Sequence, residues 1–119
     1  MRLGNLERPI MDALWARPEG MLAQQLADEL PSGPAVTTVL TVLLRLSQKG
    51  LVSRERVGRA HLYKAVGSKD AFVAEAMHAA LDEAGDVTAA VQRFVGAVSP
   101  EVAAALRTAL DEQRDGESP

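Results

Sequence analysis

Cysteine is absent from the 119-residue chain, aromatic residues make up only 3%, and there are only two histidines, His61 and His78. Without cysteine there is no disulfide framework and no thiolate metal site, and we expect neither a metal nor another cofactor. No run approaches about 18 consecutive apolar residues, which excludes a membrane-spanning helix. Few aromatics beside abundant alanine favour closely packed helices with small side chains.

The groupings that catalysis requires are also missing. A base and a nucleophile, or a metal cluster, must meet in a pocket, but the two histidines lie on different predicted elements. Glycine-rich phosphate loops are absent, and the carboxylates Asp82 and Glu83 fall on the wet face of a predicted helix. We therefore expect a protein that is not an enzyme. The opening residues, MRLGNLERPIMD, contain no apolar stretch of signal-peptide length, so we expect the protein in the cytoplasm.

Positive charge is concentrated in the middle of an acidic chain, whose formal net charge is −3. Residues 32–66 carry six basic side chains against Glu55 alone, a balance of +5, whereas residues 1–31 and 67–119 have balances of −2 and −6. A polyanion would therefore meet the middle third and be repelled by the C-terminal third. On charge alone, a solvated hairpin whose arginines bind nothing is an equally good interpretation.

The apolar pattern predicts three helices before this basic stretch ends. Apolar residues recur at three- and four-residue steps over residues 3–15, which predicts an amphipathic helix. A short helix follows over residues 22–30, and Met21 before it can form a short strand contact. The third helix covers residues 35–49 and ends at Gly50, the usual stop residue.

The third predicted helix has an apolar side and a polar side. At about 100° per residue, the apolar side comprises Val36, Val39, Leu40, Val42, Leu43 and Leu46. The polar side comprises Thr37, Thr38, Thr41, Leu44, Arg45 and Gln48. A surface helix usually carries Glu and Lys on its wet face, but here that face holds no acid.

Threonine and arginine on an exposed helix face are suited to DNA. Threonine hydroxyls can bind phosphates, threonine methyls can touch the thymine methyl, and Arg45 can reach a guanine edge or a phosphate. We therefore predict that Thr37, Thr38, Thr41 and Arg45, together with Gln48, contact DNA. The alternative is that the first two threonines only satisfy free amides of the first helical turn, which leaves Thr41 unexplained.

A basic hairpin follows the third helix. Residues 51–57 can pair with residues 61–66 around a turn in which Gly58 supplies the backbone conformation. We expect Arg59 at the tip to lie along a minor groove or a run of phosphates, and Tyr63 to be half-buried against the helices. The basic residues of this wing that we predict to contact DNA are Arg54, Arg56, Arg59 and Lys64.

Three further helices are predicted in the C-terminal third, opening after Ser68, Asp86 and Ser99. About fifty residues in three helices enclose little core, so we expect their apolar faces to pack against a second copy in a homodimer. Two recognition helices would then lie ~34 Å apart on a palindrome. The predicted interface residues are Phe72, Val73, Met77, Leu81, Val91, Phe94, Val95, Leu106 and Leu110. Alternatively, these helices fold back on the N-terminal domain of the same chain.

The expected fold is mainly α with a small β wing. We expect a winged helix-turn-helix DNA-binding domain over residues 1–66, a helical dimerisation domain over residues 67–113 and a flexible tail over residues 114–119. The alternative function is a winged-helix scaffold that binds other proteins and no nucleic acid. A salt-dependent shift of duplex DNA would separate the two functions.

Several separated stretches resemble the winged-helix repressors of the penicillinase and methicillin-resistance type, the BlaI and MecI family. They are LGNLERPIMDALW, VTTVLTVLLRLSQKGLV, GRAHLYKA and, near the end, RFVGAVSPEVAAALRTALDE. The resemblance implies a homodimeric transcriptional repressor of dyad-symmetric operators, commonly with TACA/TGTA half-sites, linked to beta-lactam or cell-wall stress. It matches Thr37, Thr38, Thr41 and Arg45 to the family's recognition-helix face and Arg59 to its wing tip.

The chain departs from that family pattern in two places. Copper-responsive relatives carry a cysteine-rich tail, so the lack of cysteine excludes copper sensing by that route. The family's induction route resembles cleavage by a membrane sensor protease at an Asn-Phe bond, and the matching position here is Arg93–Phe94. Either the protease differs in specificity or the signal does. Phe94 as part of a dimer core explains this residue equally well.

Overall fold

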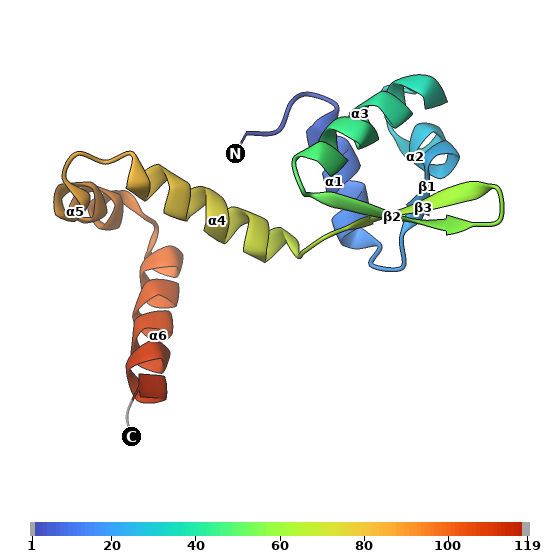
Figure 1. Ribbon diagram of the computed structural model, residues 1–119. Helices are drawn as coiled ribbons and strands as arrows, with labels where there is room; N and C mark the ends of the chain where they lie inside the picture. The colour runs from blue at the N-terminus through green and yellow to red at the C-terminus, as the bar shows by residue number, and fades with distance from the viewer. Residues whose placement is uncertain (1, 118–119) are drawn as a thin grey trace. The chain divides into compact units, whose positions relative to one another are not determined.

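The structure is a computed structural model that describes residues 2–117. Its elements are α1 (Glu7–Ala16), β1 (Met21–Leu22), α2 (Ala23–Glu29), α3 (Val36–Gln48), β2 (Val52–Val57), β3 (Ala60–Ala65), α4 (Lys69–Asp82), α5 (Val87–Ala97) and α6 (Pro100–Glu117) (Figure 1). The chain divides into two compact units, residues 1–77 and 78–119. The boundary between them lies within α4, whereas we predicted it after residue 66.

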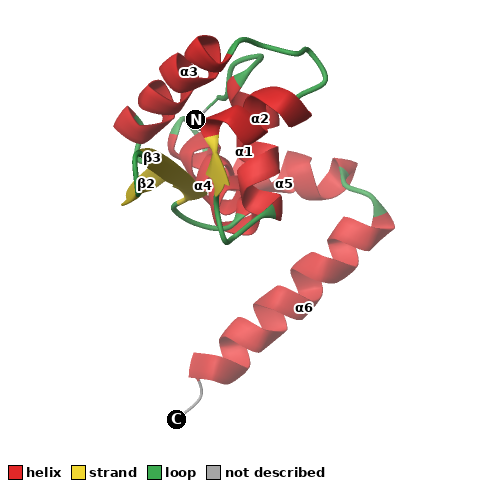
Figure 2. Cartoon of the chain, turned by 90° about the vertical axis from the view of Figure 1, so that its right-hand side faces the viewer, coloured by secondary structure: helices red, strands yellow, loops and turns green. Residues whose placement is uncertain are grey.

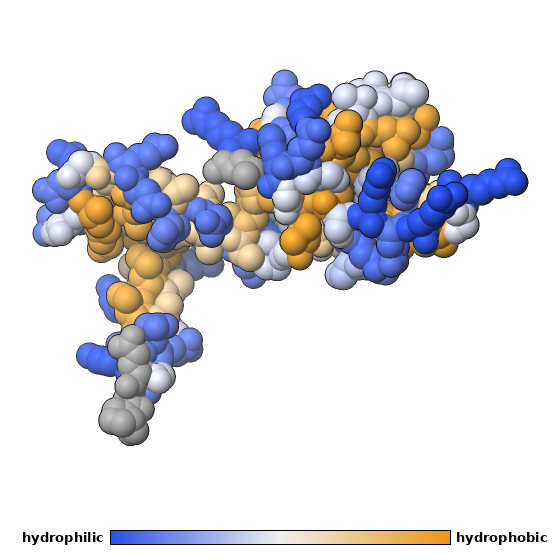
Figure 3. Space-filling view, in the orientation of Figure 1, coloured by the Kyte–Doolittle hydropathy of each residue, from blue (hydrophilic) through white to orange (hydrophobic). Residues whose placement is uncertain are grey.

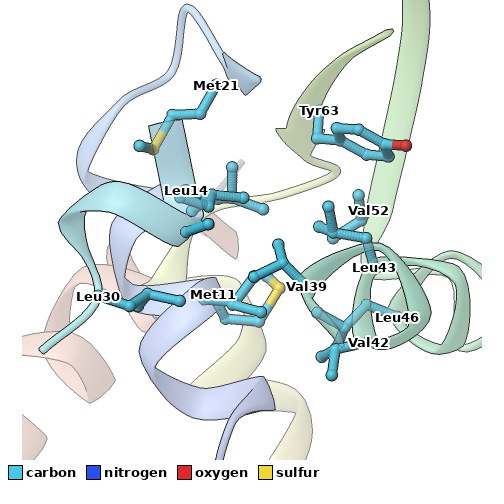
Figure 4. Packing of buried hydrophobic residues seen from close by; sticks show 13 residues of the cluster. Met11, Leu14, Met21, Leu30, Val39, Val42, Leu43, Leu46, Val52 and Tyr63 are labelled. Atoms are coloured by element: carbon cyan, nitrogen blue, oxygen red, sulfur yellow. The ribbon is translucent and has the colours of Figure 1, made fainter. Parts of the chain in front are cut away.

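The first unit is a winged helix. Helices α1, α2 and α3 pack against a three-stranded antiparallel sheet with strand order β1–β3–β2 (Figure 2). The short strand predicted at Met21 is confirmed, because Met21 pairs with Tyr63 and Leu22 with Leu62. The largest fully buried side chains are Ile10, Met11, Leu14, Met21, Leu26, Val39, Leu43 and Leu46; Figure 4 shows how this core packs. Burial of each such side chain contributes about 1.5–3 kcal/mol, and together they hold α3 on the sheet.

The third helix lies where the sequence predicted it, and Gly50 ends it with a φ of 79°. Four residues of its apolar side, Val39, Val42, Leu43 and Leu46, are buried as expected. Leu40 is the exception, since 41% of it is exposed. The buried arc of α3 is therefore narrower than the wheel suggested, and Leu40 belongs to the exposed side.

The predicted hairpin forms, but residues 52–57 pair with residues 60–65 and the turn has two residues, Gly58 and Arg59. We expected residues 51–57 to pair with residues 61–66. Gly58 has a φ of 64°, whereas the φ of Arg59 is not positive, so the turn has the signs of type II′. Tyr63 in β3 is more deeply buried than we predicted, with 6% exposed. It faces Met21 across the β1–β3 pair, which removes it from any contact with bases.

The helix starts predicted in the C-terminal third are confirmed by side-chain caps. The hydroxyl of Ser68 accepts a hydrogen bond from the amide of Ala71 at 3.0 Å. Asp86 and Ser99 cap α5 and α6 in the same way, at 3.0 and 3.2 Å. Such caps each contribute about 1 kcal/mol.

The last helix is longer than expected. We predicted a flexible tail from residue 114, but α6 continues to Glu117, and residues 118–119 lie outside the described part of the chain. Arginine, glutamine and glutamate near the end are good helix formers, and Arg114 pairs with Asp111 one turn earlier at 3.3 Å. Local preferences therefore suffice to continue the helix.

Candidate nucleic-acid interface

The exposed side of α3 presents the residues that the sequence assigned to DNA. Thr37, Thr38, Thr41, Arg45 and Gln48 are all exposed. The Thr41 hydroxyl donates a hydrogen bond to the carbonyl oxygen of Thr37 at 3.0 Å, which gives this threonine a local partner inside the helix. Its hydroxyl oxygen can still accept a hydrogen bond and its methyl group stays exposed. The helix therefore offers a polar face that is uncharged except for Arg45.

Two arginines lie at or near the turn of the wing. The Nε atom of Arg56 donates a hydrogen bond to the Gly58 carbonyl oxygen at 3.1 Å, which bends this side chain over the turn. Its remaining guanidinium donors are available for phosphate oxygens. Arg59 lines a shallow hollow of about 290 Å³ with Leu40 of α3 and His61 of β3. Residues of the wing and of α3 therefore line the same hollow.

The register of the hairpin separates the other two basic residues of the wing. Arg54 lies opposite Tyr63, on the sheet face that carries the core, whereas Lys64 lies opposite Ser53 on the other face. There the Lys64 ammonium is 3.3 Å from a carboxylate oxygen of Glu55. The structure thus groups Arg54 with Arg56 and removes Lys64 from their face.

Sequence reasoning missed an ion pair between Glu7 and Lys49. Glu7 is 4% exposed, and its two carboxylate oxygens lie 2.8 and 3.0 Å from the Lys49 ammonium. The Gly4 amide also donates to Glu7 at 2.8 Å. The Lys49 hydrogen bond, then the Gly4 amide, lower the pKa of Glu7, and burial opposes them. The partners lie 42 positions apart in the sequence, and no sequence pattern indicated this contact.

This pairing changes the charge that is available to a partner. Lys49 and Lys64 are compensated by carboxylates of the same chain. Among residues 2–116, whose side chains are described, no carboxylate forms an ion pair with the four arginines of the middle third. These arginines are Arg45, Arg54, Arg56 and Arg59. Figure 3 shows hydrophilic side chains projecting from the hairpin end of this unit.

The residues predicted for a dimer interface are mostly exposed within one chain. Phe72 is the exception, because its ring packs on Trp15 of α1 with centroids 5.2 Å apart. Leu106 is half-buried. The exposed members are Val73, Met77, Leu81, Val91, Phe94, Val95 and Leu110. The Arg93–Phe94 bond lies inside α5, in helical backbone.

The side chains of residues 2–116 form no cluster of three or more His, Cys, Asp or Glu residues that could bind a metal ion. Over the same residues, every helix is too short or too polar to cross a membrane.

Comparison with known proteins identifies the family. The family model described as penicillinase repressor matches residues 3–112. This chain is 43% identical over 120 residues to the transcriptional regulator BlaI of two Mycobacterium tuberculosis strains, CDC 1551/Oshkosh and ATCC 25618/H37Rv. That match covers 97% of this chain and 87% of each relative. The chain belongs to the penicillinase repressor family. Its relatives are transcriptional regulators, so the predictions of a repressor and of a non-enzyme are confirmed.

Solved structures share the fold of this penicillinase repressor family member at low sequence identity. A MarR-family transcriptional regulator from Rhodococcus sp. RHA1 is 19% identical with a TM-score of 0.53, covering 91% of this chain and 71% of that one. MepR of Staphylococcus aureus is 19% identical with a TM-score of 0.52, covering 98% and 81%. These likenesses confirm the winged-helix fold.

Proposed function

We propose that this protein is a DNA-binding transcriptional repressor that holds duplex DNA between the exposed side of α3 and the arginines of its wing. The observation that carries the proposal is the combination of an acid-free helix face with four arginines that lack ion pairs. Threonine, glutamine and arginine together can bind both base edges and phosphates. A named BlaI regulator at 43% identity supports this role.

The repressor acts as a homodimer in this proposal. Apolar side chains such as Val91, Phe94 and Val95 on α5 are exposed in a single chain, and Figure 3 shows apolar atoms at the surface of α5 and α6. A symmetric pair would cover them and present two copies of α3 to a dyad-symmetric operator, about 34 Å apart. Half-sites of the TACA/TGTA type are the first sequences to test.

Release from the operator has two candidate routes. One is cleavage of the Arg93–Phe94 bond by a membrane sensor protease in response to beta-lactam or cell-wall stress. Because this bond is in the helical backbone of α5, cleavage would require local opening of that helix. The other route is a different inducing signal, in which case Phe94 serves only the dimer. As a protein that acts on DNA, it is assigned to the cytoplasm.

The proposal is tested by selecting bound fragments from the sheared genomic DNA of the host. We expect enrichment of a small set of fragments that contain one inverted repeat upstream of genes. Recovery of fragments that share no common sequence would contradict the proposal of sequence-specific repression. Absence of any retained DNA at low ionic strength would favour the alternative, a winged helix that binds other proteins.

A further inference from the structure

Two leucines lie on the exposed side of α3. Leu40 is 41% exposed and Leu44 is 59% exposed. They are four residues apart in one helix, so their side chains are neighbours on its surface. Single exposed leucines are common on protein surfaces, whereas adjacent apolar side chains within a functional face indicate a contact outside the chain.

The leucine pair occupies a defined position within the interface. At about 100° per residue, Leu44 lies within about 40° of Thr37 and Gln48, near the centre of the exposed side. Leu40 lies toward the wing, because it lines the same hollow as Arg59. The exposed side of α3 therefore has an apolar strip, Leu40 and Leu44, which extends from near its centre to the hollow beside Arg59 of the wing.

We propose that this apolar strip reads the C5-methyl groups of thymines in the major groove. The inference rests on the proposed DNA binding and adds a specificity determinant to it. The thymine methyl is the apolar group that base pairs present in the major groove, so it is the natural partner of an exposed leucine on a recognition helix. Arg45 follows Leu44 directly in the same helix and is exposed, and Arg59 of the wing lines the hollow beside Leu40, so positive charge lies near both leucines. That setting favours a polyanion over an apolar protein surface.

Removal of the methyl group alone isolates this contact. Replacing one thymine by deoxyuridine leaves base pairing, charge and the phosphate backbone unchanged. Burial of one methyl-sized group changes affinity about fourfold. An operator duplex is first selected from a random library with the full chain, and each thymine is then replaced in turn by deoxyuridine.

Dissociation constants are measured at one fixed salt concentration for the wild type, Leu40→Ala, Leu44→Ala and Val66→Ala. Val66 is the matched control, because it is 61% exposed and lies just beyond β3, at the end of the hairpin away from the turn. We expect the wild type and Val66→Ala to lose about fourfold in affinity at one or more substituted thymines. Leu44→Ala should bind the thymine and deoxyuridine duplexes equally at those positions, whereas Leu44→Met, which keeps an apolar side chain, should retain the difference.

The results separate this inference from the proposed function. An equal methyl effect in the wild type and both alanine variants overturns the leucine contact and leaves DNA binding intact. If Leu40→Ala and Leu44→Ala bind every duplex with the affinity of the wild type, the leucine contact with DNA is also overturned, and the strip is assigned to another partner. Failure of the wild type to select any duplex overturns the proposed function itself. Urea unfolding checks each variant, and the exposure of both leucines predicts unchanged midpoints.

Discussion

The basic residues of the middle third differ in the partners that the fold gives them. Lys49 and Lys64 neutralise Glu7 and Glu55, so their charge is compensated before any ligand arrives. Arg45 is exposed on α3 and forms no ion pair with any of residues 2–116. A count of charges along the sequence gives each of these lysines and arginines the same weight. It cannot show that Lys49 is paired, because its partner Glu7 lies in α1.

We predict that Arg45→Ala weakens operator binding by about 1–3 kcal/mol if the guanidinium reads a base, and that specificity relaxes at one position. If the guanidinium holds a phosphate, affinity falls evenly for operator and random duplexes. Titrations of both duplexes with both proteins distinguish the two roles. Arg107→Ala is the control, since Arg107 is an exposed arginine of α6. An unchanged affinity of Arg45→Ala for both duplexes would remove Arg45 from the interface.

We predict that Glu7→Gln destabilises the fold by about 1–3 kcal/mol at pH 7, because it removes the charge that Lys49 binds. The pKa of Glu7 is lowered from its ordinary value of 4.5. Its contribution is therefore complete above about pH 4.5 and is lost as the pH falls through the lower pKa of the folded state. The difference between the two proteins, measured by urea unfolding, should shrink as the pH is lowered below 4.5.

Glu83→Gln is the control for this measurement, because Glu83 is exposed beyond the end of α4. It should match the wild type at every pH. Equal stability of Glu7→Gln and the wild type at pH 7, or a difference that persists undiminished in acid, would show that the Glu7–Lys49 pair contributes no net stability.

At the scale of elements, the wing depends on one backbone conformation. Gly58 has a φ of 64°, and no atom lies within 4 Å of a Cβ placed there. A side chain at this position would therefore cause backbone strain but no steric clash. We predict that Gly58→Ala costs about 1–3 kcal/mol locally and weakens operator binding by displacing Arg56 and Arg59. Chemical unfolding and duplex titration measure the two effects.

Gly116→Ala provides the comparison, because Gly116 lies in α6, where alanine is the better helix former. It should leave operator affinity unchanged. Full affinity and full stability of Gly58→Ala would mean that the wing can reach DNA through another turn geometry.

Elements with a clear period were predictable from the sequence, and contacts between elements were not. Apolar residues at three- and four-residue steps located α3, and glycine and proline marked its ends. The exposure of Leu40 was not predictable, since it depends on how wide an arc of α3 the sheet and neighbouring helices cover. The position of Lys64 follows from strand register, which assigns alternate residues to opposite faces.

At the scale of the whole molecule, a single copy of the chain leaves apolar side chains of α5 exposed, among them Val91, Phe94 and Val95. We predict that Phe94→Asp yields monomers and lowers operator affinity, because a charge would then face the partner's apolar surface. Phe94 is 46% exposed in one chain, so the substitution should not unfold α5. Sedimentation velocity measures the oligomeric state, and Gln92→Asp on the polar side of α5 is the control. An intact dimer of Phe94→Asp would reject Phe94 as an interface residue.

The family could be predicted from the sequence because several separated stretches of the chain resemble known repressors. The assignment of Thr37, Arg45 and Arg59 to DNA remains a prediction. The compact-unit boundary inside α4 was not predictable, since it follows from Phe72 packing on Trp15. That contact ties the start of α4 to the winged helix. Composition alone showed no break there, because alanine and acidic residues continue on both sides.

The salt dependence of operator binding tests most directly whether the exposed side of α3 and the wing hold DNA. The logarithm of the association constant is measured against the logarithm of salt concentration for the wild type and for the double variant Arg56→Ala/Arg59→Ala. We expect a steep negative slope for the wild type and a slope shallower by about 2 for the variant, one phosphate contact for each arginine. Identical slopes, or no association of the wild type at low salt, would contradict the DNA interface described above.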